Sequence, residues 1–404
     1  MIIGPCTVVS GGPSPVVLEG AAVRVVGSHI AQIGLAGSLA AAHPEETLWP
    51  ARGRVVLPGL VNGHAHLARH LARGLGLRTP EEWRRFERAL SPEDVRWAAT
   101  AALVEGVRHG VTTVCDFHRS DRCLDLSLSE VVGAAKQVGV RVAACYGAAE
   151  DDPPAARRAA FEECLTFANE LARERSHRWR AMLGVRATSL AGVDALLDQA
   201  LEAAGDRLAV HVDLALDLTP AERWRGVRPW RDGGPPALWA HAESAPRGLL
   251  GAAQERGDAL TAIAPGAAAT LGRDADVGWG SDDSVNAPPL GDGAWSAGVR
   301  ADAHYRRLFV SGPRWAERQF GSGLGQVAPG APADLVLVDY RPSTEFSSRT
   351  LADHLWAGLL RAPVSGVMVA GEIVMDHGQL VTLDEREVAE RARECARRVW
   401  ARLG

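Results

Sequence analysis

The stretch Val56-Leu57-Pro58-Gly59-Leu60-Val61-Asn62-Gly63-His64-Ala65-His66-Leu67 is the part of the sequence from which the fold is inferred. An apolar run with a Pro-Gly turn leads into two histidines that are two residues apart. Because side chains alternate between the two faces of a strand, His64 and His66 point to the same face at the end of such a run. Two imidazoles on one face make up half of a metal site.

Strand-like runs recur through the middle of the chain and alternate with helical stretches. The helical stretches include 92–109 and 155–174, where apolar residues recur at helical spacing. The seven further strand-like runs are 111–116, 140–146, 181–185, 208–212, 237–241, 259–263 and 276–280. Eight strands that alternate with helices over about 270 residues predict an α/β fold of the (β/α)₈ TIM-barrel type. The segment 213–236 looks more like a loop, so we expect a shortened barrel helix there.

The two ends of the chain share a different pattern. Short β-like runs separated by glycine, proline and serine occupy residues 1–54, and a matching set occupies 325–383. We expect these ends to build one discontinuous β-sandwich beside a barrel of residues 55–324. Residues 384–404 carry an apolar stripe and predict a C-terminal amphipathic helix.

Composition narrows the class of protein. The 404 residues are 47% hydrophobic with a formal charge of −5 and no long block of one sign, which argues against a nucleic-acid or membrane-surface binder. There is no apolar run of membrane-spanning length and no secretory signal pattern, so we expect a cytoplasmic protein. Six scattered cysteines without a Cys-x-x-Cys pair predict reduced thiols.

Titratable residues stand at the ends of several predicted strands, where TIM barrels place their active sites. His64 and His66 end the first strand, His211 the fifth, His241 the sixth and Asp282 the eighth. We expect His64, His66, His211 and Asp282 to hold one divalent metal ion, with zinc as first choice and iron as second. Such an ion lowers the pKa of its water from about 15.7 to about 7, and Asp282 would accept the proton of this nucleophile.

The sequence resembles the amidohydrolase superfamily, and within it the chlorohydrolase and aminohydrolase group that includes SsnA-type aminohydrolases. The resemblance covers nearly the whole chain and weakens between about residues 175 and 318. It implies a homodimeric mononuclear metal hydrolase acting on C–N or C–Cl bonds of ring substrates, in which His241 serves mainly as an outer ligand or oxyanion stabiliser. The matching stretches are 58–66 with Ala72-Arg73-Gly74, 110–118, 330–340 and 369–375.

Two departures from the family pattern restrict the chemistry. Members with two metals bridge them with a carboxylated lysine that ends strand four, where this chain has Val185-Arg186-Ala187. The one lysine, Lys136, falls in a predicted helix, which excludes a lysine-bridged metal pair. Deaminating members carry His-x-x-Glu on strand five to protonate a ring nitrogen, and this chain has Leu214 in place of that glutamate.

Three interpretations of this missing glutamate stay open. Glu243 or Asp213 could protonate the substrate from a new position, or the reaction could be amide or lactam hydrolysis, for which the metal and Asp282 suffice. Alternatively, the protein could be a catalytically impaired scaffold or binding protein. We expect hydrolysis of a C–N bond in a small, cyclic, polar substrate, with catalytic Asp282, His241 and Glu243. Hydrolysis of a C–Cl bond is less favoured than hydrolysis of a C–N bond.

Three further residues are expected to bind the substrate. His118 ends the second strand, Arg186 ends the fourth, and Arg73 follows the histidine pair. The Arg186 guanidinium could bind a substrate carboxylate through two parallel hydrogen bonds, or it could form an internal salt bridge. The expected partner is therefore a small molecule.

Overall fold

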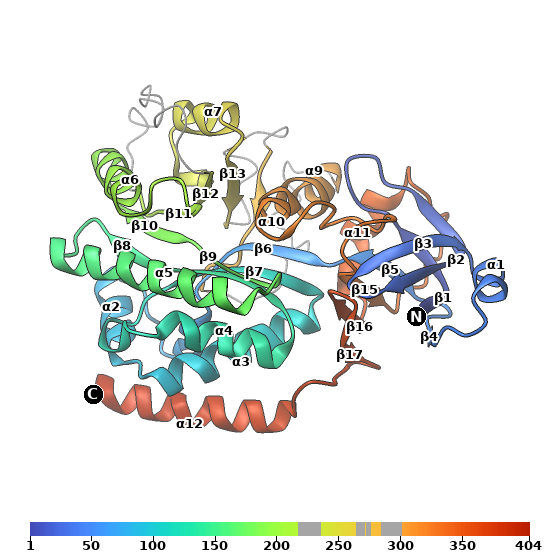
Figure 1. Ribbon diagram of the computed structural model, residues 1–404, viewed down its shortest axis with the longest axis horizontal. Helices are drawn as coiled ribbons and strands as arrows, with labels where there is room; N and C mark the ends of the chain where they lie inside the picture. The colour runs from blue at the N-terminus through green and yellow to red at the C-terminus, as the bar shows by residue number, and fades with distance from the viewer. Residues whose placement is uncertain (217–235, 264–270, 272–275, 284–300) are drawn as a thin grey trace.

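Eight parallel strands from the middle of the chain form a nearly closed barrel in the computed structural model, which describes residues 1–216, 236–263, 271, 276–283 and 301–404 (Figure 1). This confirms the predicted α/β class and (β/α)₈ barrel, and each strand falls on a predicted run. A short strand, β9 (Trp179–Ala181), also pairs with β8. The barrel strands are β6 (Leu60–Ala65), β7 (Val111–His118), β8 (Arg141–Ala149), β10 (Leu183–Ala187), β11 (Val210–Leu214), β12 (Ala237–Ala240), β13 (Ala259–Ala262) and β14 (Gly278–Trp279).

The first and last strands of the barrel meet beside the predicted metal residues. Ala65 and Asp282 form a parallel bridge, and the Ser281 amide donates to the His64 carbonyl at 2.8 Å. The His66 amide donates to the Asp282 carbonyl at 2.9 Å. Barrel closure therefore fixes the backbone of Asp282 against the backbone of the histidine pair.

Helices surround the barrel strands on the outside (Figure 1). The predicted helices at 92–109 and 155–174 are α3 and α5. Local sequence explains the start of α3, because Pro92 occupies its first turn and Ser91 caps it by accepting a hydrogen bond from the Asp94 amide. The helices here are η1 (Leu67–Ala72), α2 (Pro80–Ala89), α3 (Pro92–Arg108), η2 (Asp121–Cys123), α4 (Ser127–Val138), α5 (Pro154–Glu174), α6 (Leu190–Ala204), η4 (Ala242–Ser244), α7 (Arg247–Glu255), α9 (Ala301–Arg306), η5 (Arg307–Ser311) and α10 (Gly312–Phe320).

Both ends of the chain contribute to a second, mainly antiparallel sheet, as predicted. Its strands follow one hydrogen-bonded path in the order β18-β17-β16-β15-β5-β1-β2-β3, with β4 paired to β1. The same two end segments of the chain also contain the helices α1 (Ala36–Ala42), α11 (Leu351–Ala357) and η6 (Leu359–Arg361). The strands are β1 (Ile2–Val9), β2 (Val17–Val26), β3 (His29–Leu35), β4 (Leu48–Pro50), β5 (Val55–Pro58), β15 (Leu335–Val338), β16 (Val364–Val369), β17 (Glu372–Asp376) and β18 (Gln379–Leu380).

The quoted stretch 56–67 serves both sheets. Strand β5 pairs with β1 and β15 in the end sheet, whereas β6 pairs with β7 in the barrel. Only Gly59 separates them, and a Cβ at this position would lie 2.2 Å from the Thr112 Oγ1 atom. Glycine is therefore required where the chain passes from one sheet to the other. The domain bounds expected from the sequence stay a prediction.

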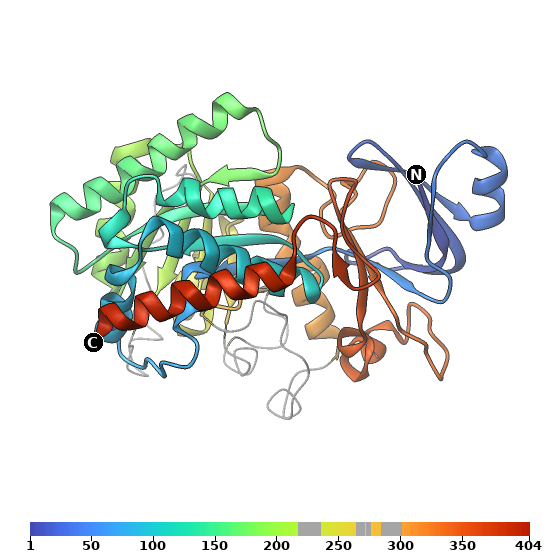
Figure 2. The ribbon, with the colours of Figure 1, turned by 90° about the horizontal axis from the view of Figure 1, so that it is seen from below.

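The C-terminal helix α12 (Glu385–Leu403) lies along the outside of the barrel (Figure 2). Most of its predicted apolar stripe is buried, including Val388, Cys395 and Val399. The Trp400 Nε1 atom donates to the Leu71 carbonyl of η1 at 2.8 Å. The helix therefore supports the segment that directly follows His66.

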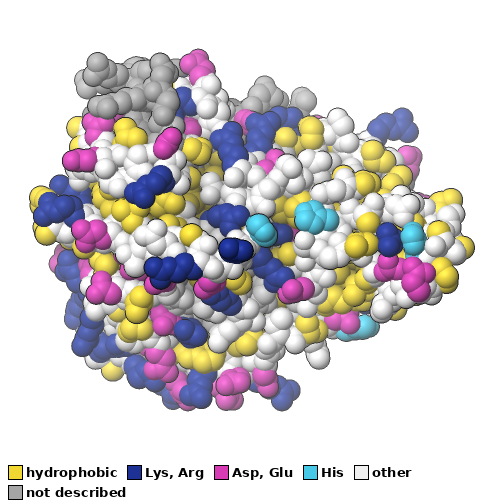
Figure 3. Space-filling view, in the orientation of Figure 1, with side chains coloured by type: hydrophobic (Ala, Val, Ile, Leu, Met, Phe, Trp, Pro, Cys, Tyr) yellow, Lys and Arg dark blue, Asp and Glu magenta, His cyan; other side chains and the backbone are white. Residues whose placement is uncertain are grey.

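Among the described residues, we find no helix that combines the length and the apolar character of a membrane span. Acidic and basic side chains are mixed over the face shown in Figure 3. Most of the predicted loop-like segment 213–236 lies outside the described residues, which stop at 216 and resume at 236.

Candidate metal and active site

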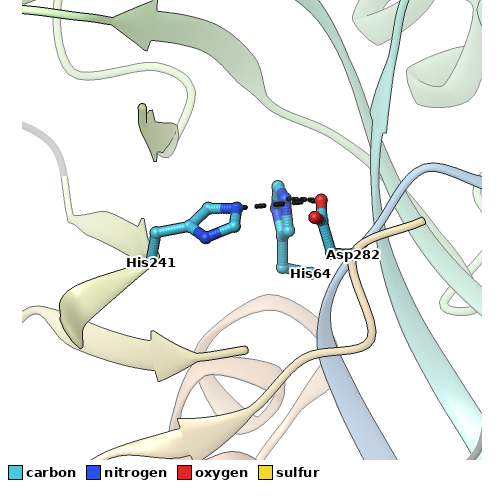
Figure 4. Close-up of side chains that lie close together, drawn as sticks. All are labelled: His64, His241 and Asp282. Atoms are coloured by element: carbon cyan, nitrogen blue, oxygen red, sulfur yellow. Dashed lines mark ion pairs between the residues drawn. The ribbon is translucent and has the colours of Figure 1, made fainter. Parts of the chain in front are cut away.

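Three imidazoles approach one carboxylate oxygen at the C-terminal end of the barrel, and Figure 4 shows two of them, those of His64 and His241, beside Asp282. The Asp282 Oδ1 atom lies 3.2 Å from His66 Nε2, 3.5 Å from His64 Nε2 and 3.7 Å from His241 Nε2. His64 belongs to β6 and His66 follows it, His241 follows β12, and Asp282 follows β14. The structure thus brings together four of the residues expected from the sequence.

Two of these residues have an unusual backbone. His241 has a φ of 56° and Asp282 a φ of 55°, in the left-handed region that residues other than glycine rarely adopt. Such conformations cluster at functional sites, where the surrounding structure holds them in place. The backbone therefore turns both side chains toward the histidine pair at some conformational cost.

Strand β11 supplies a second pair of groups. The His211 Nε2 atom lies 2.8 Å from His64 Nδ1, and Asp213 Oδ1 lies 3.6 Å from His241 Nε2. Because side chains alternate along a strand, His211 and Asp213 face the barrel interior together, while Leu214 is buried in the hydrophobic core. The strand therefore directs the carboxylate of Asp213 into the barrel interior, whereas the side chain at position 214 points to the opposite face.

The orientation of His66 is set by a backbone contact. Its Nδ1 atom lies 2.7 Å from the Phe117 carbonyl, which can only accept, so Nδ1 carries the proton. The Nε2 lone pair then faces Asp282. Burial, with the Arg69 charge, lowers the pKa of His66 to about 3, which keeps this ring in the neutral form that metals bind.

Charges around Asp282 favour its ionised form. Burial alone would raise the pKa of this carboxyl, but the hydrogen bond from the His241 ring holds the pKa well below its usual range. Burial likewise would lower the pKa of His241, yet hydrogen bonds to Asp282 and Glu243 raise this pKa to about 10. An anionic Asp282 therefore faces a protonated His241.

The donor set fits a divalent metal of borderline softness. Among the described residues, the buried His64 Nε2 atom has no hydrogen-bond partner, which is the state expected of a nitrogen reserved for an ion. Within the described residues, two sets have ligand atoms within 4.8 Å of one another: His64 with His241 and Asp282, and His64 with His66 and Asp213. His211 is in neither set, although it contacts His64.

The other expected site residues lie at different distances from this centre. The Glu243 carboxylate lies 3.8 Å from His241 Nδ1 and accepts from the Ile263 amide, so it supports His241 from behind. His118 is buried with its Nε2 atom 2.7 Å from the Ser120 Oγ atom. Arg73 does not join the group, because its guanidinium donates to both carboxylate oxygens of Glu105 on the surface.

A cavity at the mouth of the barrel contains residues that sequence reasoning missed. Arg69 and Arg119 line it together with the expected Arg186. Both missed residues stand within three positions of a predicted strand end, at the same barrel face as the histidines. Their position near the strand ends could have identified them as site residues, but an arginine at such a position is equally typical of the protein surface.

Known proteins resemble this chain in sequence over most of its length. The model of the Amidohydrolase family matches residues 55–223. The chain is 26% identical over 435 residues to a 5-methylthioadenosine/S-adenosylhomocysteine deaminase of Pelotomaculum thermopropionicum, covering 99% of this chain and 98% of that protein. A protein of the same name from Natronomonas pharaonis is 28% identical over 393 residues and covers 87% of this chain and 88% of the relative.

Solved structures share the fold. An adenosine deaminase from Xanthomonas campestris with bound zinc aligns with a TM-score of 0.74 at 20% identity, covering 99% of this chain and 98% of that one. The zinc complex of atrazine chlorohydrolase TrzN from Arthrobacter aurescens aligns with a TM-score of 0.72 at 19% identity, covering 98% and 99%. At this level of identity the likeness concerns the fold alone.

Proposed function

Because the chain belongs to the amidohydrolase superfamily, we propose that it hydrolyses a C–N bond of a small, cyclic, polar substrate with one divalent metal ion. Zinc is the first choice of metal and iron the second. The observation that carries the proposal is the approach of His64, His66 and His241 to a single oxygen of Asp282. Homodimerisation and a cytoplasmic location stay predictions.

Each of the site residues has a distinct role in the proposed reaction. His64 and His66, with His211 or Asp213, would hold the ion, which supplies an activated water and polarises the bond to be cleaved. The ionised Asp282 accepts the proton of the attacking water and passes it to the leaving nitrogen. The protonated His241 donates to the oxygen on which negative charge develops, and Glu243 keeps its ring in place.

Strand β11 favours amide or lactam hydrolysis over ring deamination. Deamination of an aromatic ring requires a proton donor for the ring nitrogen, and Leu214 cannot supply one. Burial would raise the pKa of Asp213, but Arg186 and His241 lower it, so this carboxylate is ionised and lacks a proton to donate. Ring deamination is the second candidate, supported by the names of the curated relatives.

A substrate screen tests the proposal. We would load the purified protein with zinc, confirm the metal content, and offer cyclic amides, cyclic amines and chlorinated heterocycles while scoring carboxylate, ammonia and chloride release. Carboxylate release that disappears after chelation and returns with zinc would support lactam hydrolysis, and ammonia release from ring amines would support the second candidate. Less than about a tenth of an equivalent of bound zinc would contradict the metal site. A zinc-loaded protein without turnover would favour the impaired scaffold.

A further inference from the structure

The cavity beside the metal residues is lined by four arginines. It opens at the ends of β7, β8, β10 and β11 and has a volume of about 90 Å³, which is enough for a carboxylate group. It adjoins the metal residues through Asp213, whose Oδ2 atom lies 3.6 Å from Arg186 and whose Oδ1 atom lies 3.6 Å from His241. Its cationic lining consists of Arg69, Arg84, Arg119 and Arg186.

Three of these four arginines are paired with carboxylates of the protein. Arg69 donates to one Glu87 oxygen through Nε at 2.9 Å and Nη2 at 2.7 Å. Arg119 binds both Asp152 oxygens, at 2.9 and 3.0 Å. Arg84 forms an ion pair with Asp151. Each of these charges is therefore matched before any substrate enters.

Arg186 differs from the other three arginines. The one carboxylate within 4 Å of it among the described residues is Asp213, at 3.6 Å from Nε, which is too long for a hydrogen bond. The backbones of Arg186 and Asp213 are neighbours in the β10–β11 register. The guanidinium thus balances the charge of Asp213 while its planar set of donors stays available toward the cavity.

We propose that the substrate carries a carboxylate group that Arg186 binds through two parallel hydrogen bonds in this cavity. This inference rests on the proposed C–N hydrolase activity, because only that activity makes the bound acid a substrate. The planar fork of a guanidinium matches a carboxylate, and the cavity has room for one such group. Because Asp213 contacts both Arg186 and His241, a carboxylate held here places the rest of a small molecule over the metal residues.

Binding of a simple acid tests this site without turnover. Benzoate and benzamide would be titrated into metal-free protein by calorimetry, using wild type, Arg186→Gln, Arg186→Lys and the control Arg96→Gln. Arg96 lies on α3 and pairs with Glu130 away from the cavity. We expect benzoate to bind wild type and Arg96→Gln alike, and Arg186→Gln to bind about 10- to 100-fold more weakly.

The lysine variant keeps the charge beside Asp213 but removes the planar donor set, so its benzoate affinity should fall between wild type and Arg186→Gln. Equal affinity for benzoate and benzamide in wild type would overturn the proposal, as would equal benzoate affinity in wild type and a folded Arg186→Gln. If Arg186→Gln does not fold, the same comparison with Arg186→Lys decides. A protein that binds benzoate through Arg186 but hydrolyses nothing would contradict the proposed function and leave the carboxylate site intact.

Turnover gives the second measurement once the screen has identified a substrate. The acid form and the carboxamide form of that substrate would be compared in wild type and Arg186→Gln. We expect the substitution to raise the KM of the acid form at least about tenfold while the carboxamide form changes little. An equal loss for both forms would mean that Arg186 only supports the fold of the site.

Discussion

Asp282 has a left-handed backbone conformation and three imidazole neighbours. A substitution that replaces one carboxylate oxygen tests its role in catalysis. Asp282→Asn keeps the shape of the side chain but removes the base that accepts the proton. We expect kcat to fall about 10²- to 10⁴-fold on the substrate found in the screen. The thermal unfolding midpoint should stay close to that of wild type. Full activity in Asp282→Asn would mean that another group is the base.

Residue types at strand ends were the part of the site that sequence could predict. His64, His66, His241 and Asp282 follow apolar runs, and the closure of a barrel brings such ends to one face. The direction of a side chain beyond the strand end was not predictable in the same way. Arg73 follows the 3-10 helix η1 and pairs with Glu105 on the surface, a contact that the strand-end pattern does not indicate.

At the scale of an element, β11 explains why position 214 is not available for catalysis. Leu214 packs in the hydrophobic core, on the face opposite to His211 and Asp213. A glutamate there would be a buried carboxylate without a partner, so Leu214→Glu should lower the free energy of unfolding by about 3 kcal/mol or more. Urea unfolding measures this change.

The control for this prediction is Leu214→Met, which keeps the volume and should cost less than about 1.5 kcal/mol. Neither variant should gain ammonia release from ring amines. A Leu214→Glu protein that is as stable as wild type and deaminates such a ring would show that position 214 can reach the substrate.

Sequence patterns located the elements well but could not assign every strand to its sheet. The runs at 111–116 and 140–146 are bounded by turn residues and were found as β7 and β8. The stretch around Pro58-Gly59 reads as one strand with a turn, yet it divides into β5 and β6 in different sheets. The pairing of β5 with β15 is a long-range contact that no local pattern records.

At the scale of the whole molecule, metal binding should stabilise the folded protein, because the ligand atoms converge only in the fold. Zinc at 100 times its Kd adds about 2.7 kcal/mol to the free energy of unfolding. We expect the midpoint of thermal unfolding to rise with zinc and to return after chelation. The shift should be lost in His66→Ala and retained in His43→Ala, whose ring contacts Gln32 far from the barrel mouth. An unchanged midpoint in wild type would argue against the site.

The junction at Gly59 also has a consequence for the order in which the protein is made. Chains leave the ribosome from the N-terminus, so His64 and His66 emerge early. Asp282, which closes the barrel against them, and β15, which anchors β5, are synthesised more than half a chain later. For much of translation, the histidine pair therefore lacks the residues that surround it in the folded protein. An ion captured before β11 has been made is held by two ligands only, so selection of the correct metal belongs to the fully folded chain.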